Sequence, residues 1–230
     1  IFPYVLPNLR VQNPDLKIEL LSLNNSEQMK LLKKGELDVT FTRHNSNSDE
    51  IESLFVLREP LIFILPENHP LAKYERIPVK ALNGIDFIIP AAEQSLTLHN
   101  AILDFAKANG IEFNIVQKAD NILFNINSIG MGLGCTILPG YVAPLTTSNS
   151  VIRTLDVELP YLDLYVSYHK NSSSVAVQKF IELLTRVFYL NINRDWSFFY
   201  NFSFPIEHTI IFLVNSSVFF WSILIIFLPH

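Results

Sequence analysis

The strand–helix–strand pattern within residues 16–42 constrains the fold more than any other feature of the sequence. The apolar run LKIELLSL (16–23) predicts a buried strand, and LDVTFT (37–42) predicts a second one. The segment between them has the spacing of a helix that begins near Asn25 and ends at Gly35. Two strands joined through a helix form a βαβ unit, so the pattern predicts a parallel sheet.

The same alternation continues to about residue 189. Further strands are predicted at 52–57, 60–65, 85–90, 113–117, 133–138, 151–155 and 162–168, and helices at 3–12, 79–82, 96–109, 120–131 and 175–189. The irregular stretch at 52–84, where Glu59-Pro60 separates two strands, favours two sheets over one. We therefore predict a doubly wound α/β body whose chain builds one lobe, then a second, and returns to the first. Two consecutive domains are the alternative that the pattern leaves open.

The composition excludes several classes of protein. A net charge of −5 argues against a nucleic-acid-binding body, which usually carries a basic patch. The single cysteine, Cys135, cannot form an internal disulfide, so we expect a reducing compartment, the cytoplasm. The first residues show no basic segment followed by an apolar one, so no signal peptide is predicted. A chain that begins at Ile1, within a helical pattern, is interpreted as a fragment or a processed product.

The composition changes near Tyr189. Residues 190–230 contain no glycine and no alanine and are rich in Phe, Ile and Asn. Residues 209–228 form an uncharged run of 20 residues, which is long enough to cross a bilayer. We predict an apolar tail, residues 190–230, that lies outside the domain and arises from a frameshift or read-through. Membrane insertion of residues 209–228 is the less favoured alternative.

No arrangement of residues indicates catalysis or metal binding. The six histidines lack metal-ligand spacing, and Cys135 lies within a strand pattern that indicates a buried, inert thiol. The glycines of GMGLG (130–134) follow a helix and precede a strand, which is the reverse of a dinucleotide-binding loop. They are interpreted as ending the helix and letting the strand start close to it. We expect neither an enzyme nor a bound cofactor or metal.

Helix N-termini that follow strands are the better candidates for a binding site. They lie at Asn25 and Ser26, at residues 90–95 and at Asp120. In open α/β sheets ligands bind beyond the carboxyl ends of the strands, and helix N-termini there suit a carboxylate. The alternative for Asn25, which has Gln28 as a capping-box-like partner, and for Asp120 is that each only caps its helix.

Three stretches in order resemble LysR-type transcriptional regulators. NPDLKIEL followed by QMKLLKKGELDVTFTR, then REPLIFILPENHPLA (58–72), then GMGLGCTILP (130–139) resemble segments of that family at the family's separations. The resemblance covers residues 1–189 and is closest to the branch that senses aromatic acids. It implies an effector-binding domain with a type 2 periplasmic-binding-protein-like fold, in which two Rossmann-like lobes are joined by two crossover strands. The first lobe would comprise residues 1–58 and 164–189, and the second residues 59–163.

The resemblance also implies a function. A small organic acid would bind between the lobes and control transcription through a DNA-binding domain that is absent from this chain, as is the first strand of the effector domain. Intact members form homo-oligomers. The alternatives are a solute-binding protein of a transporter, which shares the fold, and an enzyme of similar architecture.

Site residues follow from the same resemblance. Asn25, with Ser26 beside it, falls where the family places a Ser or Thr that meets the effector. Pro90, Ala91 and Ala92 fall on the loop of the second lobe that faces the cleft. Thr42 and Arg43 end a strand of the first lobe, and Arg43 could pair with a carboxylate through two hydrogen bonds. A salt bridge on the surface or between the lobes is an equally open role for Arg43.

Overall fold

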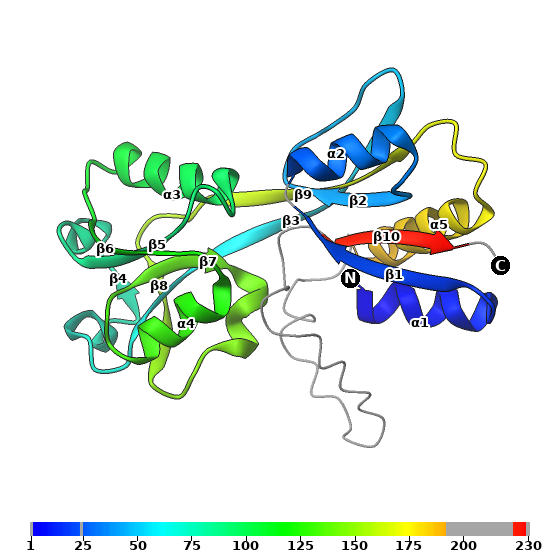
Figure 1. Ribbon diagram of the computed structural model, residues 1–230. Helices are drawn as coiled ribbons and strands as arrows, with labels where there is room; N and C mark the ends of the chain where they lie inside the picture. The colour runs from blue at the N-terminus through cyan, green and yellow to red at the C-terminus, as the bar shows by residue number, and fades with distance from the viewer. Residues whose placement is uncertain (1, 24, 192–222, 229–230) are drawn as a thin grey trace. The chain divides into compact units, whose positions relative to one another are not determined.

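The chain folds into two compact units. The computed structural model describes residues 2–23, 25–191 and 223–228 (Figure 1). The first unit holds the described residues up to Leu57 and those from Asp163 onward, and the second holds Arg58–Leu162. Two strands, β3 (Ile51–Pro66) and β9 (Tyr161–His169), contain the points at which the chain passes between the units.

The first unit is built on a mixed sheet. Besides parts of β3 and β9, it contains α1 (Phe2–Gln12), β1 (Lys17–Ser22), α2 (Asn25–Lys34), β2 (Val39–Thr42), α5 (Val175–Asn191) and β10 (Ile223–Leu228). The strand order is β1-β10-β2-β9-β3. Both β1 and β2 pair antiparallel with β10, so they run parallel to each other as the βαβ pattern predicts. The prediction of a wholly parallel sheet is wrong, because β10 separates them and β9 is also antiparallel to β2.

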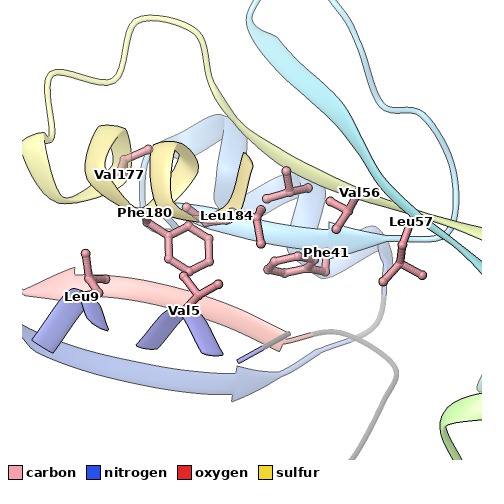
Figure 2. Close-up of a cluster of buried hydrophobic side chains, with 10 residues drawn as sticks. Val5, Leu9, Phe41, Val56, Leu57, Val177, Phe180 and Leu184 are labelled. Carbon is pink, nitrogen blue, oxygen red and sulfur yellow. The ribbon is translucent and has the colours of Figure 1, made fainter. Parts of the chain in front are cut away.

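Helices cover this sheet through two apolar clusters. Figure 2 shows the larger cluster, in which α1 and α5 pack against β2, β3 and β9. Its buried members are Val5, Leu9, Val39, Phe41, Val56, Leu57, Val166, Val177, Phe180 and Leu184. The rings of Phe41 and Phe180 meet edge to face with centroids 6.3 Å apart. A smaller cluster of Leu32, Leu37 and Ile51 lies under α2.

The second unit contains shorter elements. They are η1 (Pro70–Lys73), β4 (Arg76–Ile77), η2 (Val79–Leu82), β5 (Asp86–Pro90), α3 (Leu96–Ala108), β6 (Asn114–Ala119), α4 (Ile122–Gly130), β7 (Thr136–Pro139), η3 (Gly140–Leu145) and β8 (Ser150–Leu155). Strands β7 and β8 pair antiparallel with β3, β4 pairs parallel with β8, and β5 pairs parallel with β6. The predicted apolar stripe of α3 is buried: Leu98, Ile102, Phe105 and Ala106.

One predicted break is absent. Strand β3 runs unbroken through Glu59 and Pro60, where two separate strands were predicted. Proline lacks an N–H group, but its backbone can remain extended. The pairing of β3 with β7 begins at Leu61 and that with β8 at Phe63, so neither ladder uses position 60.

Two helix starts differ from the predictions. The N-cap of α4 is Asn121, whose Oδ1 accepts a hydrogen bond from the Phe124 N–H at 2.7 Å, and not Asp120. Asn121 is placed to reach the third residue of the helix, which is the usual geometry of a cap. Helix α2 includes Asn25 as its first residue instead of starting after it.

The glycines of residues 130–134 have the structural role that the sequence indicated. Gly132 ends α4 with a φ of +80°, which an L side chain adopts only with strain. A Cβ added to Gly134 would lie 2.9 Å from the carbonyl oxygen of Asp86, so the backbones of β5 and the segment leading into β7 approach closely there.

The C-terminal region is only partly described. Residues 192–222, which contain most of the uncharged run, lie outside the described residues. Residues 223–228, which the sequence analysis assigned to a tail outside the domain, form β10 within the sheet of the first unit. Among the helices that the structure describes, none is long and apolar enough to cross a membrane.

The cap of α4 provides a test of the second unit. Asn121→Ala removes the oxygen that accepts from Phe124, and we expect the free energy of unfolding to fall by about 1 kcal/mol. Asn121→Asp keeps an oxygen at the same position and should stay within about 0.5 kcal/mol of the wild type. Urea unfolding followed by circular dichroism measures both, and an equal loss in the two variants would contradict the capping role.

Candidate functional site

The carboxyl ends of β5 and β6 meet at one edge of the second unit. Pro90 and Ala119, the last residues of the two strands, are paired in the parallel register. The Ala91 N–H donates to the Ala119 carbonyl at 2.8 Å, which extends the pairing past the end of β5. Four of the predicted site residues, Pro90, Ala91, Ala92 and Asp120, therefore come together, and α3 and α4 begin just beyond them.

Side-chain hydrogen bonds hold the loop between β5 and α3. The buried Ser95 caps α3 by accepting from the Leu98 N–H at 3.1 Å, and its own N–H donates to the Ala91 carbonyl at 3.1 Å. The ring of His99 contacts the Pro90 carbonyl through Nδ1 at 2.8 Å. Because a carbonyl oxygen only accepts, Nδ1 must carry the proton. The sequence analysis noted only that the histidines lack metal-ligand spacing and did not assign this contact to His99.

The electrostatics of this edge combine opposite effects. Neither α3 nor α4 has an acidic residue in its first turn, so no carboxylate of their own offsets their partial positive charge there. Asp120, however, is exposed immediately before α4, and its Oδ1 accepts from the Asn121 side chain at 3.0 Å. An anion at the start of α4 would gain from the helix and lose by repulsion from Asp120.

In the first unit the predicted residues lie at the end of β2 and the start of α2. Thr42 is buried, and its hydroxyl donates to the His44 carbonyl at 2.8 Å, so this hydrogen bond shapes the turn that follows. Arg43 is half-buried and comes directly after the strand. Asn25 and Ser26 are the first residues of α2, and their side chains lie outside the described part of the structure.

Gln28 connects these two segments. Its side chain is buried, its Nε2 donates to the Leu23 carbonyl at 2.7 Å, and its Oε1 accepts from the Thr40 hydroxyl. The first turn of α2 is thereby tied to the residue after β1 and to β2. The sequence analysis placed Gln28 in a capping-box-like pair, whereas its amide bridges the two strands. The only sequence signal for this role was a glutamine one turn into the predicted helix.

The electrostatics of Cys135 agree with an inert thiol. Burial, and then the charge of Asp86, raise the pKa of Cys135 to about 12. The fully buried sulfur lies where β5 and the start of β7 meet, because the Ile88 N–H donates to the Cys135 carbonyl at 2.8 Å. No group of three or more metal-ligating side chains is found in the part of the chain that the structure describes.

His69 gives the NHPLA segment a structural explanation. Its Nδ1 accepts from the Leu71 N–H at 3.2 Å and so caps η1, whose first residue is Pro70. Burial lowers the pKa of His69, while the charge of Asp86 acts in the opposite direction. A lowered pKa favours the neutral ring, which is the form that can accept this hydrogen bond.

Helix α4 also carries buried polar groups that the sequence analysis missed. Asn125 and Ser128 are almost fully buried, and within the described residues neither the amide of Asn125 nor the hydroxyl of Ser128 has a hydrogen-bond partner. Such groups usually cost about 1–3 kcal/mol each when buried unpaired. They lie one and two turns beyond the start of α4.

Comparison with known proteins identifies the family. Residues 1–188 match the family model described as the LysR substrate binding domain. The chain belongs to the LysR substrate-binding domain family. This confirms the resemblance to LysR-type regulators that the three sequence segments indicated, and it does not favour the transporter alternative.

Curated relatives of this LysR domain are transcriptional regulators. The Hca operon transcriptional activator HcaR of Escherichia coli (strain K12) is 36% identical over 184 residues, which cover 80% of this chain and 62% of the relative. The HTH-type transcriptional regulator AlsR of Bacillus subtilis (strain 168) is 25% identical and is covered over 60% of its length. The LysR domain thus spans about three fifths of the length of these relatives.

Solved structures share the fold. The BenM effector binding domain with its effector benzoate matches with a TM-score of 0.70 and 17% identity, covering 90% of this chain and 91% of that chain. The effector binding domain of QuiR in complex with shikimate matches with a TM-score of 0.70 and 19% identity, covering 82% and 90%. These likenesses confirm the predicted α/β fold of the type 2 periplasmic-binding-protein kind with two crossover strands.

The bridging role of Gln28 leads to a stability prediction. Gln28→Ala leaves the Leu23 carbonyl and the Thr40 hydroxyl without their partner, so we expect the free energy of unfolding to fall by about 2–4 kcal/mol. Lys30→Ala, an exposed position on the same helix, should change it by less than about 0.5 kcal/mol. Urea unfolding compares the two, and similar small losses would contradict the bridge.

The thiol of Cys135 leads to a chemical prediction. At pH 8 a pKa of about 12 in place of 9.0 makes the thiolate fraction about a thousandfold smaller. We therefore expect Ellman's reagent to leave the folded protein essentially unmodified and to label one thiol per chain in denaturing urea. Rapid labelling of the folded protein would show that Cys135 is accessible and ionised.

Proposed function

We propose that this LysR domain binds a small organic acid and that binding controls transcription through a DNA-binding domain of the intact protein. The single observation that carries the proposal is the edge where β5 and β6 end together and α3 and α4 begin. Parallel strands that end beside helix N-termini form the usual ligand site of open α/β sheets. The named relatives, which are transcriptional regulators, support the same function.

The predicted residues have distinct roles in this proposal. Backbone N–H groups of Ala92 and of the first turn of α3 would donate to the acid, because the first N–H groups of a helix have no partner within it. Arg43, at the end of β2, would pair with the carboxylate, and Thr42 would hold the turn that presents it. Asn25 and Ser26 would contact the effector from the start of α2.

We propose an aromatic carboxylate as the effector. HcaR, a relative with 36% identity, is an operon transcriptional activator, and this supports a role in regulating an operon. BenM is a fold neighbour whose effector is benzoate. Binding would act by stabilising one conformational state of the regulator over another, and only the difference in affinity between those states can shift the equilibrium. The intact regulator would be a cytoplasmic homo-oligomer.

A matched set of ligands tests the proposal on the 230-residue chain. We expect benzoate to raise the midpoint of thermal unfolding, because a ligand that binds only the folded state stabilises it. Benzamide has the same shape without the charge and should have little effect, and cyclohexanecarboxylate, which keeps the charge without the aromatic ring, should have a smaller effect than benzoate. An unchanged midpoint with a broad panel of carboxylic acids would contradict acid binding.

A substitution of Arg43 tests whether its side chain binds the carboxylate. Arg43→Gln should weaken the binding of benzoate by about tenfold or more, because it replaces a charged hydrogen-bond donor. Arg186→Gln, at an exposed position of α5, is the matched control and should leave the affinity unchanged. Isothermal titration calorimetry reports affinity separately from stability. Equal affinities of the two variants would exclude Arg43 from the site.

A further inference from the structure

Two aromatic side chains of the first unit, Phe55 of β3 and Tyr165 of β9, form an aromatic pair that is partly open to solvent. Their rings meet edge to face, with centroids 5.9 Å apart and planes at 76°. Phe55 is 52% exposed and Tyr165 is half-buried. Neither ring belongs to the apolar cluster shown in Figure 2 or to the smaller cluster under α2. The aromatic pair therefore presents ring surface that the core of this unit does not use.

The strand register sets the aromatic pair level with the end of β2. Tyr165 is paired with Thr42, the last residue of β2. Two residues further along β9, the Ser167 hydroxyl donates to the Ser53 hydroxyl at 2.9 Å. These contacts set β3 beside β9 with Phe55 at the level of Tyr165. Ligands of open α/β sheets bind beyond the carboxyl ends of the parallel strands, so the aromatic pair lies at the edge where a ligand is expected.

The aromatic pair also lies on the face of the sheet that carries α2. Successive side chains of a strand point to opposite faces. The two neighbours of Phe55 in β3 pack with α1 and α5 on one face. Ile51, four residues before Phe55, packs under α2 on the other face. Phe55 therefore points to the same side as α2, whose first residues, Asn25 and Ser26, are proposed to contact the effector.

Hydrogen bonds fix the backbone that presents Phe55. The Ser53 N–H donates to Asn47 Oδ1 at 2.8 Å, and Asn47 Nδ2 donates to the Ser53 carbonyl at 3.3 Å. The buried Ser53 hydroxyl accepts from Ser167, so the strand is held by main chain and side chain two residues before Phe55. An aromatic side chain on a fixed backbone has only two torsions to order, so its entropy loss on binding is small.

The size of the exposed surface favours a small aromatic ligand over a protein partner. A Phe or Tyr side chain can bury about 150–250 Å², so two half-exposed rings present roughly 200 Å². A stable protein interface needs about 800 Å² from each partner. The loop that follows β2, residues 43–50, contains no apolar residue, so it does not extend the apolar surface. A small apolar patch beside polar groups suits the ring of a small ligand.

We propose that Phe55 and Tyr165 form a ring subsite that binds the aromatic ring of the effector and makes the domain prefer aromatic to aliphatic acids. The inference rests on the proposed function and adds two residues that the sequence analysis did not select. An edge-to-face pair can take a third ring in an offset or edge-to-face arrangement, and such contacts add affinity beyond the burial of apolar area.

Two acids and a set of variants test the ring subsite by isothermal titration calorimetry on the 230-residue chain. Phe55→Leu removes the ring and keeps an apolar side chain. We expect it to weaken the binding of benzoate about two- to tenfold, because a ring–ring contact is lost. The affinity for cyclohexanecarboxylate, which has no aromatic ring, should change by less than about twofold. A general loss of stability would not produce this difference between the two acids.

Conservative and distant substitutions are the matched controls. Tyr165→Leu should repeat the selective loss of benzoate affinity, whereas Tyr165→Phe keeps the ring and should bind benzoate as the wild type does. Tyr74→Leu removes an exposed ring of the second unit and should leave both affinities unchanged. About half of the Phe55 ring is in solvent, so its replacement by leucine should leave the chain folded.

The outcomes separate this inference from the proposed function. If the wild type binds neither acid, the aromatic effector and the ring subsite are both overturned. If benzoate binds, but Phe55→Leu and Tyr165→Leu leave its affinity unchanged or weaken both acids equally, the ring subsite is wrong and the proposed function stands. Sedimentation velocity tests the other occupant: if Phe55→Leu dissociates an oligomer without a selective loss of benzoate affinity, the aromatic pair is a contact between chains and the inference is overturned.

Discussion

The pairing of strand backbones is the constraint on which the rest of the structure depends. A buried N–H or C=O group must find a partner, so the register of each strand fixes where the next loop begins. In the second unit the register that sets Pro90 opposite Ala119 also sets Ala91, Ala92 and Asp120 at one edge. In the first unit the register of β2 with β9, in which Thr42 is opposite Tyr165, fixes where Arg43 leaves the sheet.

A few buried or half-buried polar side chains connect the strands to the loops by hydrogen bonds. Gln28 ties α2 to the residue after β1 and to β2, and Ser95 and His99 hold the segment between β5 and α3. Each hydrogen bond adds only about 1 kcal/mol to stability, but leaving a buried partner unmet costs about 1–3 kcal/mol. The loops at the proposed site therefore keep their conformation mainly because breaking these hydrogen bonds would leave buried polar groups without partners. A backbone that is already in place loses less entropy when a ligand binds.

Local patterns in the sequence predicted local structure well. The βαβ pattern, the apolar stripe of α3 and the role of Gly132 depend on residues that are near one another in the chain, and each agrees with the structure. Long-range pairing was not predictable in this way. The pairing of β10 with β1 joins residues 17–22 to residues 223–228, and the periodicity of neither segment indicates which strand it pairs with.

The errors at the candidate site have a related cause. Asp120 and Asn121 are both good caps by residue type, and only the backbone geometry selects Asn121. Gln28 fits a capping box in the sequence, but the nearby Leu23 carbonyl and Thr40 hydroxyl are better partners once β1 and β2 are placed. The sequence could therefore select the loops of the candidate site, but it could not assign the hydrogen bonds of each side chain there.

The charges near the ends of β5 and β6 only weakly favour an acid. Exposed side chains near the ends of β5 and β6 include Glu93 and Asp120 but only one cation, Lys118, so the local side-chain charge is negative. The helix N-termini attract an anion, yet their contribution is typically only about 0.3–1 kcal/mol at the surface. A carboxylate at this edge would therefore gain little binding free energy from the electrostatics of the second unit alone.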